Sequence, residues 1–539
     1  MAVLAALGVG VFLAGLELMV TAVALPSIVT DLADWTQLRH ASWIVNAYLV
    51  AYVAMMPLAG RLADRYGIVR PFTISLLAFA AGSAAAGAAQ SLDQLIAARV
   101  LEGLGAGAIV PLATAGASHL YEGPARARAL GIIGALTFLG MAAGPFAGAA
   151  ILGLLNTRAP LEAAGLANGP LVDLLAPAWR WVFYFDVPLA LLALVYLGAA
   201  GPGLEPPRGP AALRVPGLVL FTAGLATTLL AITWTGSSDA PGGSAGIAAM
   251  LAAGVLCLAA AFWLGARQRD PLLDPRVYAD PVYGGAVSVS ALTGYALATA
   301  LIGGAVFVDR VLYGGSPEQR VALGALAAAM AVGALVSGFA LHRIGIVPIS
   351  LAGIGLGAGG MALLGGTTPA TPLASLALFL ALFGLGFGLT VSPRSTAAVE
   401  ALGQSAYGVA SAAVTVARML GMAVGLAVLT TFGSGRIEAL SRVLDDATYR
   451  DSILPAVLRG RPLNDGLVVD ALERWAAGQG AGILAGLFLV AGAIMVIAVL
   501  PALAMRRRHG GARVASVDAP GTDADHASGG SDADAAIAI

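Results

Sequence analysis

Long apolar runs constrain this chain more than any other feature of its sequence. The hydrocarbon core of a bilayer is about 30 Å thick, so a membrane-spanning helix needs roughly 20 apolar residues. Of the 539 residues, 59% are hydrophobic and 11% are charged, whereas about 25% of the residues in a soluble domain are charged. The sequence therefore predicts an all-α polytopic membrane protein.

Fourteen stretches are long and apolar enough to cross the membrane as helices. They are expected at 3–28, 42–59, 71–90, 94–118, 128–153, 181–200, 215–234, 244–266, 282–308, 321–341, 346–366, 372–392, 405–431 and 480–504. An even number of spans places both termini on one side. The loops of that side carry most of the arginines, so the positive-inside rule puts both termini in the cytoplasm and the protein in the inner (plasma) membrane.

An internal repeat divides these spans into two halves. The loop sequences GRLADRYG (60–67) and GFALHRIG (338–345) share a glycine, an arginine five positions later and a final glycine. The copies lie eight spans apart, whereas a duplication of six helices would place them six apart. Two helices, 215–234 and 244–266, are therefore expected as an insertion between two six-helix halves. The predicted domains are 1–200 for the N-terminal half, 201–280 for the inserted pair with its loops, and 281–505 for the C-terminal half.

Two segments are expected outside the membrane. Residues 433–479, between the last two spans, have apolar residues at three- and four-residue spacing, which predicts short amphipathic helices on the outer face. Residues 506–539 are rich in Gly, Ala, Ser and Asp. Such a segment cannot bury enough apolar surface to fold, so we expect a disordered cytoplasmic tail.

The composition excludes several classes of protein. All 29 basic residues are arginine, so the chain lacks the lysine of a Walker A loop and that of a Schiff-base enzyme. A formal net charge of −1 provides no basic surface for nucleic acid. The single cysteine, Cys257, excludes an intrachain disulfide, and the histidines are too scattered to hold a metal. We expect no cofactor and no metal, and any driven transport would use an ion gradient or a partner ATPase.

Charged residues inside the spans are candidate functional residues, because an ionisable group in hydrocarbon must pair or face a cavity. Glu17 lies near the centre of the first span and is expected to carry a proton; a permanent ion pair is the alternative. Arg99 and Glu102 are three residues apart on one helix, close enough to pair. That pair could be structural or part of a proton relay, and Arg418 is a further charge, in the thirteenth span.

Several motifs resemble those of the major facilitator superfamily, in its branch of fourteen-helix drug:proton antiporters. LELMVTAVALP (16–26) keeps the branch's first-helix pattern, with Glu17 where aspartate is usual. Arg99 and Gly103 match the fourth-helix motif, with Glu102 where glutamine is usual. WRWVFYFDVP (179–188) resembles the Trp-Arg-Trp signature of the branch, with Asp186 where asparagine is common.

Two further motifs belong to the same resemblance. The cytoplasmic gate signature is matched by Gly60, Asp64, Arg65, Gly67 and Arg70, and the fifth-helix antiporter motif by Gly140, Gly144, Pro145 and Gly148. A carboxylate such as Asp64 can bind a helix N-terminus of the opposite half, and a contact made in one state only would act as a latch. Small residues at four-residue spacing let another backbone approach closely, while Pro145 allows a bend, so this face suits a rocking interface. A solvated loop and ordinary close packing are the alternatives.

Around Arg418 the sequence VARMLGMAVG (416–425) is similar to that of the mycobacterial triacylglyceride exporters within the superfamily. The stretches 37–61 and 308–315 are similar to the same exporters. Two positions differ: Phe138 stands where those exporters have a carboxylate, and His342 replaces the acid of the second loop signature.

The resemblance implies two six-helix halves plus two inserted helices, and a proton-coupled exporter of lipidic or amphipathic molecules such as triacylglycerides. It implies proton coupling by Glu17, Arg418, Arg99 and Glu102. The expected partners are protons, a hydrophobic or lipid substrate, membrane lipids and an outer-face lipid carrier protein that docks on 433–479. The runner-up is a multidrug:proton antiporter. A membrane-embedded lipid-modifying enzyme would need clustered Asp, His or metal ligands on interfacial loops, and a channel fits intramembrane charges in both halves less well.

Overall fold

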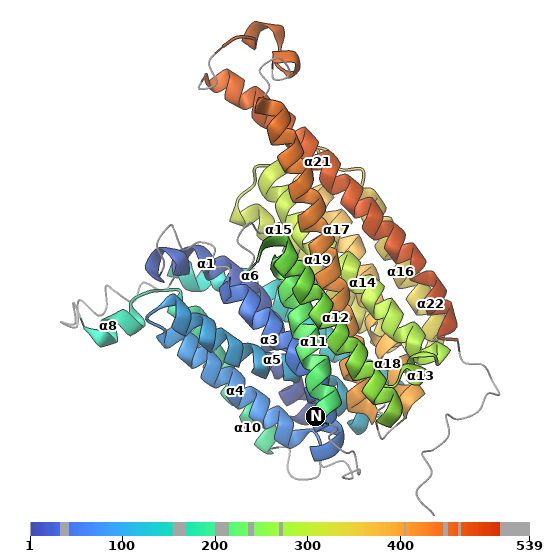
Figure 1. The fold of residues 1–539 in the computed structure, drawn as a ribbon. Helices are drawn as coiled ribbons and strands as arrows, with labels where there is room; N and C mark the ends of the chain where they lie inside the picture. Colours follow the sequence, from blue (N-terminus) through green and yellow to red (C-terminus); the bar gives the residue numbers. More distant parts are fainter. Residues whose placement is uncertain are drawn as a thin grey trace, which may run out of the picture. The chain divides into compact units, whose positions relative to one another are not determined.

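The computed structural model describes residues 2–32, 43–154, 169–199, 215–234, 242–268, 273–403, 406–445, 451–461 and 465–506, and the regular structure in these ranges is helical (Figure 1). The first group contains α1 (Ala2–Leu32), α3 (Trp43–Tyr66), α4 (Val69–Ala88), α5 (Leu92–Leu120), α6 (Gly123–Leu154), α8 (Pro170–Leu175), α9 (Arg180–Tyr184) and α10 (Asp186–Ala199). Next come α11 (Val215–Trp234) and α12 (Gly243–Gln268). The last group contains α13 (Pro275–Tyr278), α14 (Pro281–Val306), the π-helical turn η3 (Phe307–Val311), α15 (Ser316–Ile344), α16 (Ile346–Leu364), α17 (Leu373–Leu389), α18 (Val391–Leu402), α19 (Tyr407–Asp445), the 3₁₀ turn η5 (Ala456–Leu458), α21 (Gly466–Ile497) and α22 (Val499–Ala504).

Fourteen helical stretches in the described ranges are long and apolar enough to cross a bilayer, which confirms the predicted number. The twelfth is longer than expected: it spans Leu373–Leu402 as α17 and α18, whereas the sequence predicted an end at 392. The polar run Ser392-Pro-Arg-Ser-Thr396 ends the apolar stretch but not the helix. The helix therefore carries Arg394 into the bundle, where the side chain is 2% exposed.

The two groups of six spans pack by the same pattern. The first helix of each group packs on the fifth, in the pairs α1 with α6 and α14 with α19. The second packs on the fourth, in the pairs α3 with α5 and α15 with α17, and the third also packs on the fourth. The groups meet through α6 with α15 and α3 with α19.

The inserted helices lie against the line where the two groups meet. α11 contacts α3 of the first group and α19 of the last, while α12 packs on α11 (Figure 1). The repeated loops share a backbone feature too: Gly67 has a φ of 79° and Gly345 a φ of 92°. This region favours glycine, so the final glycine of each loop copy lets the chain turn between two helices.

In the described parts of 433–479, most of the helix is continuous with the neighbouring spans instead of forming separate short helices; residues 446–450 and 462–464 lie outside the described residues. α19 continues from the span to Asp445 and is 39 residues long, about 58 Å at 1.5 Å per residue. α21 begins at Gly466, well before the expected start at 480. Both helices exceed the roughly 30 Å hydrocarbon core, and Figure 1 shows them projecting together beyond the other helices. The amphipathic spacing seen in the sequence belongs to continuous helices. We call the part 430–476 the extension.

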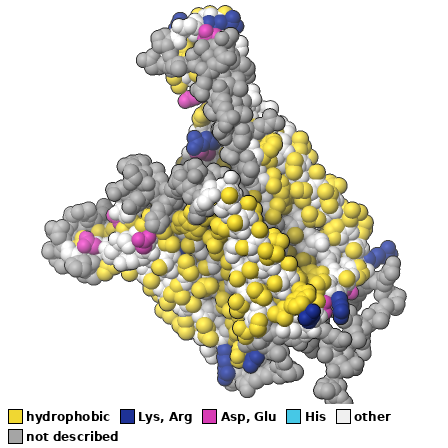
Figure 2. Space-filling view, viewed as in Figure 1, with side chains coloured by type: hydrophobic (Ala, Val, Ile, Leu, Met, Phe, Trp, Pro, Cys, Tyr) yellow, Lys and Arg dark blue, Asp and Glu magenta, His cyan; other side chains and the backbone are white. Residues whose placement is uncertain are grey.

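A hydrogen bond from a tyrosine connects the extension to the rest of the bundle. Tyr313 follows η3, has a φ of 50°, and donates a hydrogen bond from its hydroxyl to the carbonyl oxygen of Glu473 at 2.8 Å. Figure 2 shows hydrophobic side chains covering the flank of the helices below the extension, which is the surface expected to face lipid. The predicted tail, apart from Arg506, lies outside the described residues.

Candidate functional site

A buried ion cluster joins α1 to α5. The Nη1 of Arg99 donates hydrogen bonds to Oε1 of Glu17 and to Oε2 of Glu102, the latter at 2.7 Å. All three side chains are at most 1% exposed. Thr21 donates to Glu17 at 2.5 Å and Ser83 of α4 donates to Glu102 at 2.7 Å. The pair predicted from the spacing of Arg99 and Glu102 is present, and Glu17 joins it.

A third carboxylate, that of Asp186, completes this acidic cluster. Asp186 opens α10 and is 1% exposed. One carboxylate oxygen each from Glu17, Glu102 and Asp186 lies within 4.8 Å of the other two. Such spacing could hold a cation, but the guanidinium of Arg99 already binds two of the three carboxylates. The side chain of Asp186 lies within hydrogen-bond reach of Glu17, but Oε2 of Glu17 and Oδ2 of Asp186 are buried without a hydrogen-bond donor in the described part of the chain.

Aromatic side chains separate the acidic cluster from the centre of the bundle. The guanidinium carbon of Arg99 lies 4.1 Å from the centre of the Tyr48 ring, and its Nε donates to the carbonyl oxygen of Ile44 at 3.2 Å. Tyr48 stacks on Tyr52 with 5.8 Å between ring centres. Tyr52 in turn lies close enough to Arg418 for the two groups to interact electrostatically.

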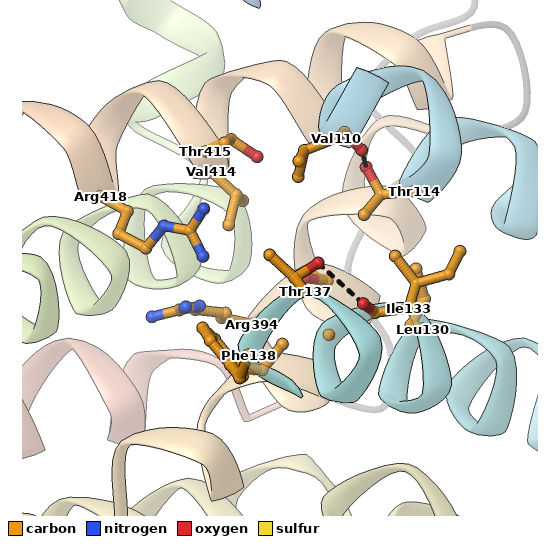
Figure 3. A pocket seen from close by; sticks show the side chains of 13 residues that line it. Val110, Thr114, Leu130, Ile133, Thr137, Phe138, Arg394, Val414, Thr415 and Arg418 are labelled. Atoms are coloured by element: carbon orange, nitrogen blue, oxygen red, sulfur yellow. Dashed lines mark hydrogen bonds between the residues drawn. The ribbon is translucent and has the colours of Figure 1, made fainter. Parts of the chain in front are cut away.

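Arg418 does not belong to the acidic cluster; it lines a cavity between the two groups of helices (Figure 3). One wall comes from α5 and α6: Val110, Thr114, Leu130, Ile133, Gly134, Thr137 and Phe138. The other comes from α18 and α19: Val391, Arg394, Ser395, Val414, Thr415 and Arg418. The cavity therefore has an apolar wall with two threonines on one side and two arginines on the other.

The gate residues lie where α3 meets the first turn of α19. Asp64 accepts hydrogen bonds from the backbone N–H groups of Gly408 at 2.7 Å and Val409 at 3.0 Å. A Cβ at Gly60 would lie 2.6 Å from the carbonyl oxygen of Gly408, so glycine lets the two helices approach. We call this end of the bundle the latch end. A charged oxygen at a helix N-terminus is favourable because it binds N–H groups that have no partner within the helix.

The other gate residues contribute differently. Gly67 makes the turn after α3 with its positive φ, and its N–H donates to the carbonyl oxygen of Ala63 at 3.0 Å. The guanidinium of Arg65 lies over the ring of its neighbour Tyr66, 5.4 Å from the ring centre. Arg70 is exposed near the start of α4.

A second contact at the latch end joins the same two groups of helices. Nη2 of Arg126, on α6, donates to the hydroxyl oxygen of Tyr407 at 2.9 Å, and the guanidinium lies 4.9 Å from the centre of that ring. No local pattern in the sequence indicates this pair, because the two residues are 281 positions apart and lie in different halves.

The glycines of the antiporter motif face α1 of their own group. A Cβ at Gly140 would overlap the carbonyl oxygen of Phe12, and one at Gly144 would lie 2.8 Å from that of Leu16. On α6 the close approach to the other half occurs instead at Gly131, where a Cβ would lie 2.7 Å from the carbonyl oxygen of Ala334. Any bending at Pro145 would therefore move α6 against α1.

Asp186 and Arg394 are buried charged residues that the sequence did not assign to a site. Asp186 lies in the quoted Trp-Arg-Trp segment, but it stands near the expected start of a span and was not grouped with Glu17. Arg394 lies two residues beyond the predicted end of its span. For Arg394 the signal that could have identified it is the helical pattern, which continues past the point where hydropathy falls. For Asp186 the signal is its position inside the predicted span 181–200, where a charge needs a partner.

The chain is similar in sequence to known transporters and in fold to a solved structure. A family model described as Major Facilitator Superfamily matches residues 7–426. A triacylglyceride transporter of Mycolicibacterium hassiacum is 32% identical over 446 residues, which cover 80% of this chain and 79% of that protein. The multidrug transporter protein MdtP of Bacillus subtilis is 25% identical over 461 residues, 84% of this chain and 80% of MdtP. Among solved structures, the proton:xylose symporter XylE superposes with a TM-score of 0.57 at 14% identity, covering 93% of this chain and 94% of XylE, which shows a shared fold.

Proposed function

The chain belongs to the Major Facilitator Superfamily, whose members are transporters, and we propose that it exports lipidic or amphipathic molecules in exchange for protons by alternating access. The observation that carries the proton coupling is the acidic cluster, in which Glu17, Glu102 and Asp186 surround Arg99. The proposal assigns the protein no enzymatic activity and no metal.

Charge balance explains why the acidic cluster suits proton exchange. Three ionised carboxylates around one guanidinium would leave two negative charges away from water, which is unfavourable in a medium of low dielectric constant. Protons on the oxygens without partners, Glu17 Oε2 and Asp186 Oδ2, would restore the balance. A proton on Glu17 also weakens its bond to Arg99, and that bond joins α1 to α5.

The latch end supports alternating access. Asp64 and Arg126 belong to one half and bind Gly408, Val409 and Tyr407 of the other. These bonds must break when the halves separate at this end, so they stabilise the closed form. With both termini in the cytoplasm, as the arginine distribution indicates, the latch end faces the cytoplasm and the extension lies outside.

Two observations favour a lipidic substrate. The relative from Mycolicibacterium hassiacum is named a triacylglyceride transporter, and this chain is 32% identical to it. The paired helices of the extension project beyond the spans, where they could shield an emerging acyl chain or receive a lipid carrier protein. Similarity to MdtP keeps a multidrug antiporter as the second candidate.

Transport in proteoliposomes with an imposed pH gradient tests the proposal. We expect the gradient to drive movement of a fluorescent triacylglyceride, and Glu17→Gln to abolish that drive, because glutamine keeps the size of the side chain and cannot exchange a proton. The matched control is Glu122→Gln, which removes an exposed carboxylate from the loop before α6. Transport that ignores the gradient, or full gradient-driven transport by the Glu17 variant, would contradict proton coupling through Glu17. Gradient-driven movement of ethidium without any lipid movement would favour the multidrug candidate.

A further inference from the structure

Two arginines share the cavity between the halves, and none of the residues that line it is acidic. Figure 3 shows the guanidinium groups of Arg394 and Arg418 on the same side of the cavity, above Phe138. The two groups are close enough to interact electrostatically, and an arginine guanidinium keeps its positive charge in proteins. The described part of the chain thus places two like charges together without a carboxylate beside them.

Some N–H groups of these two arginines have no hydrogen-bond acceptor in the described part of the chain. Arg394 is 2% exposed; its Nη1 donates to the hydroxyl of Thr293 at 2.7 Å, and its guanidinium lies 5.0 Å from the centre of the Phe387 ring. The Nε atoms of Arg394 and Arg418 are both buried without a partner among the described residues. A guanidinium with buried donors and no anionic partner costs free energy, because desolvation is not compensated by pairing. The cost is larger at Arg394, since the side chain of Arg418 is only half-buried. An oxyanion in the cavity would compensate both.

The facing wall has a different chemistry. Val110, Leu130, Ile133 and Phe138 are apolar, and the threonine hydroxyl hydrogens are already used. Thr137 donates to the carbonyl oxygen of Ile133, and the other threonine on this wall also donates to its own helix backbone. This wall can therefore contact a hydrocarbon chain, while hydrogen bonds to a ligand come from the arginines.

We propose that this cavity binds an anionic amphiphile, with a carboxylate or phosphate group held by Arg394 and Arg418 and an acyl chain against α5 and α6. Guanidinium groups suit this role since they bind such oxyanions with paired hydrogen bonds. The inference rests on the proposed function and narrows its substrate class from lipids in general to acidic ones. The cavity is small, about 40 Å³, so in this state it has room for a head group, and the acyl chain enters as the halves separate.

Binding to the purified full-length protein in phosphatidylcholine nanodiscs tests the proposal. The probes are oleate, oleoyl lysophosphatidate, methyl oleate and inorganic phosphate. We expect at least one of the two acidic lipids to bind about tenfold or more tightly than methyl oleate, the gain typical of a hydrogen bond to a charged group. Which of the two binds more tightly identifies the head group. Equal binding of methyl oleate and both acidic lipids would overturn the proposal. Binding of inorganic phosphate as tight as that of the better acidic lipid would overturn the assignment of an amphiphile.

Variants locate the preference in the cavity. Arg394→Gln and Arg418→Gln are expected to remove the preference for acidic lipids over methyl oleate, while the control Arg128→Gln, an exposed arginine of α6, keeps it. A preference that survives in the double variant would place the anion elsewhere and contradict the proposal.

The temperature of thermal unfolding tests whether Arg418 is compensated by the protein itself. Without an anion, Arg418→Met is expected to unfold at a temperature no lower than the unsubstituted protein, because the substitution removes a positive charge that has no anionic partner. A clearly lower unfolding temperature would show that the protein itself compensates the charge, and would overturn the proposal.

The proposed function and the proposed anion site can fail separately. If the protein binds oleate normally but a pH gradient does not drive oleate export, only proton coupling is refuted. If a pH gradient drives export of a neutral lipid and binding shows no preference for acidic lipids, only the anion site is refuted.

Discussion

The guanidinium of Arg99 lies 4.1 Å from the centre of the Tyr48 ring, and this contact connects the acidic cluster to the centre of the bundle. Tyr48 stacks on Tyr52, which is close enough to interact electrostatically with Arg418, a residue that lines the cavity. A change in the hydrogen bonds of Arg99 therefore has a short route of packed side chains to the proposed substrate site.

Tyr48→Leu is expected to uncouple transport from the pH gradient, because it removes both the cation–π contact and the ring stack. A cation–π contact contributes about 0.5–2 kcal/mol, so we expect gradient-driven transport to fall by roughly twofold to thirtyfold. Tyr48→Phe keeps the ring and is the matched control. Similar losses in both variants would assign the effect to the hydroxyl and contradict a role for the ring.

Asp64→Asn is expected to open the latch end. An amide has one acceptor oxygen, so it cannot accept hydrogen bonds from the N–H groups of both Gly408 and Val409 as well as a carboxylate does. Loss of about 1.5 kcal/mol of hydrogen-bond free energy shifts the ratio of closed to open protein by about tenfold. Spin labels at the exposed positions Arg128 and His342, one on each half, report the distance. Arg65→Gln is the control, since the contact described for its side chain is with its neighbour Tyr66. Identical distance distributions for Asp64→Asn and the unsubstituted protein would make Asp64 a bystander.

Gly140→Ala is expected to destabilise the protein, because the added Cβ overlaps the carbonyl oxygen of Phe12. Overpacking of this kind costs about 1–3 kcal/mol, which lowers the temperature of thermal unfolding. Gly153, on the same helix, has no atom within 4 Å of an added Cβ, so Gly153→Ala should be neutral or slightly stabilising. Equal stability of the two variants would contradict tight packing of α6 on α1.

Cysteine labelling tests the orientation. In a Cys257→Ala background, a cysteine at Val457, which lies in the extension and is 77% exposed, should react with an impermeant reagent in whole cells. A cysteine at the exposed Arg128 should react only after the membrane is permeabilised. The reverse pattern would invert the assigned topology and place the latch end outside.

Replacing 436–476 with a short Gly-Ser linker tests the extension. The remaining part of α21 and α22 still contains enough apolar residues to span the bilayer, so we expect folding and proton coupling to persist. Transfer of a labelled lipid to acceptor vesicles should fall to background. Tyr313→Phe, which removes only the hydrogen bond to Glu473, is the mild control. Normal lipid transfer by the shortened protein would refute the proposed part of the extension in lipid release.

The sequence by itself determined the membrane class, the number of spans and the pairing of Arg99 with Glu102. Each of these depends on a local property: apolar length against bilayer thickness, or residues three apart on one helix. Tertiary structure alone decided that Asp186 joins Glu17, that Arg394 lies beside Arg418, and that Asp64 binds Gly408, which is 344 positions away. A hydropathy average over a window predicts that a span ends at its first polar run, but in the packed bundle α18 and α19 continue past that point. The partners of each charged side chain come from other helices, so they depend on how the helices pack. For that reason the sequence could place charged residues in the membrane, but only the packing shows which of them have partners.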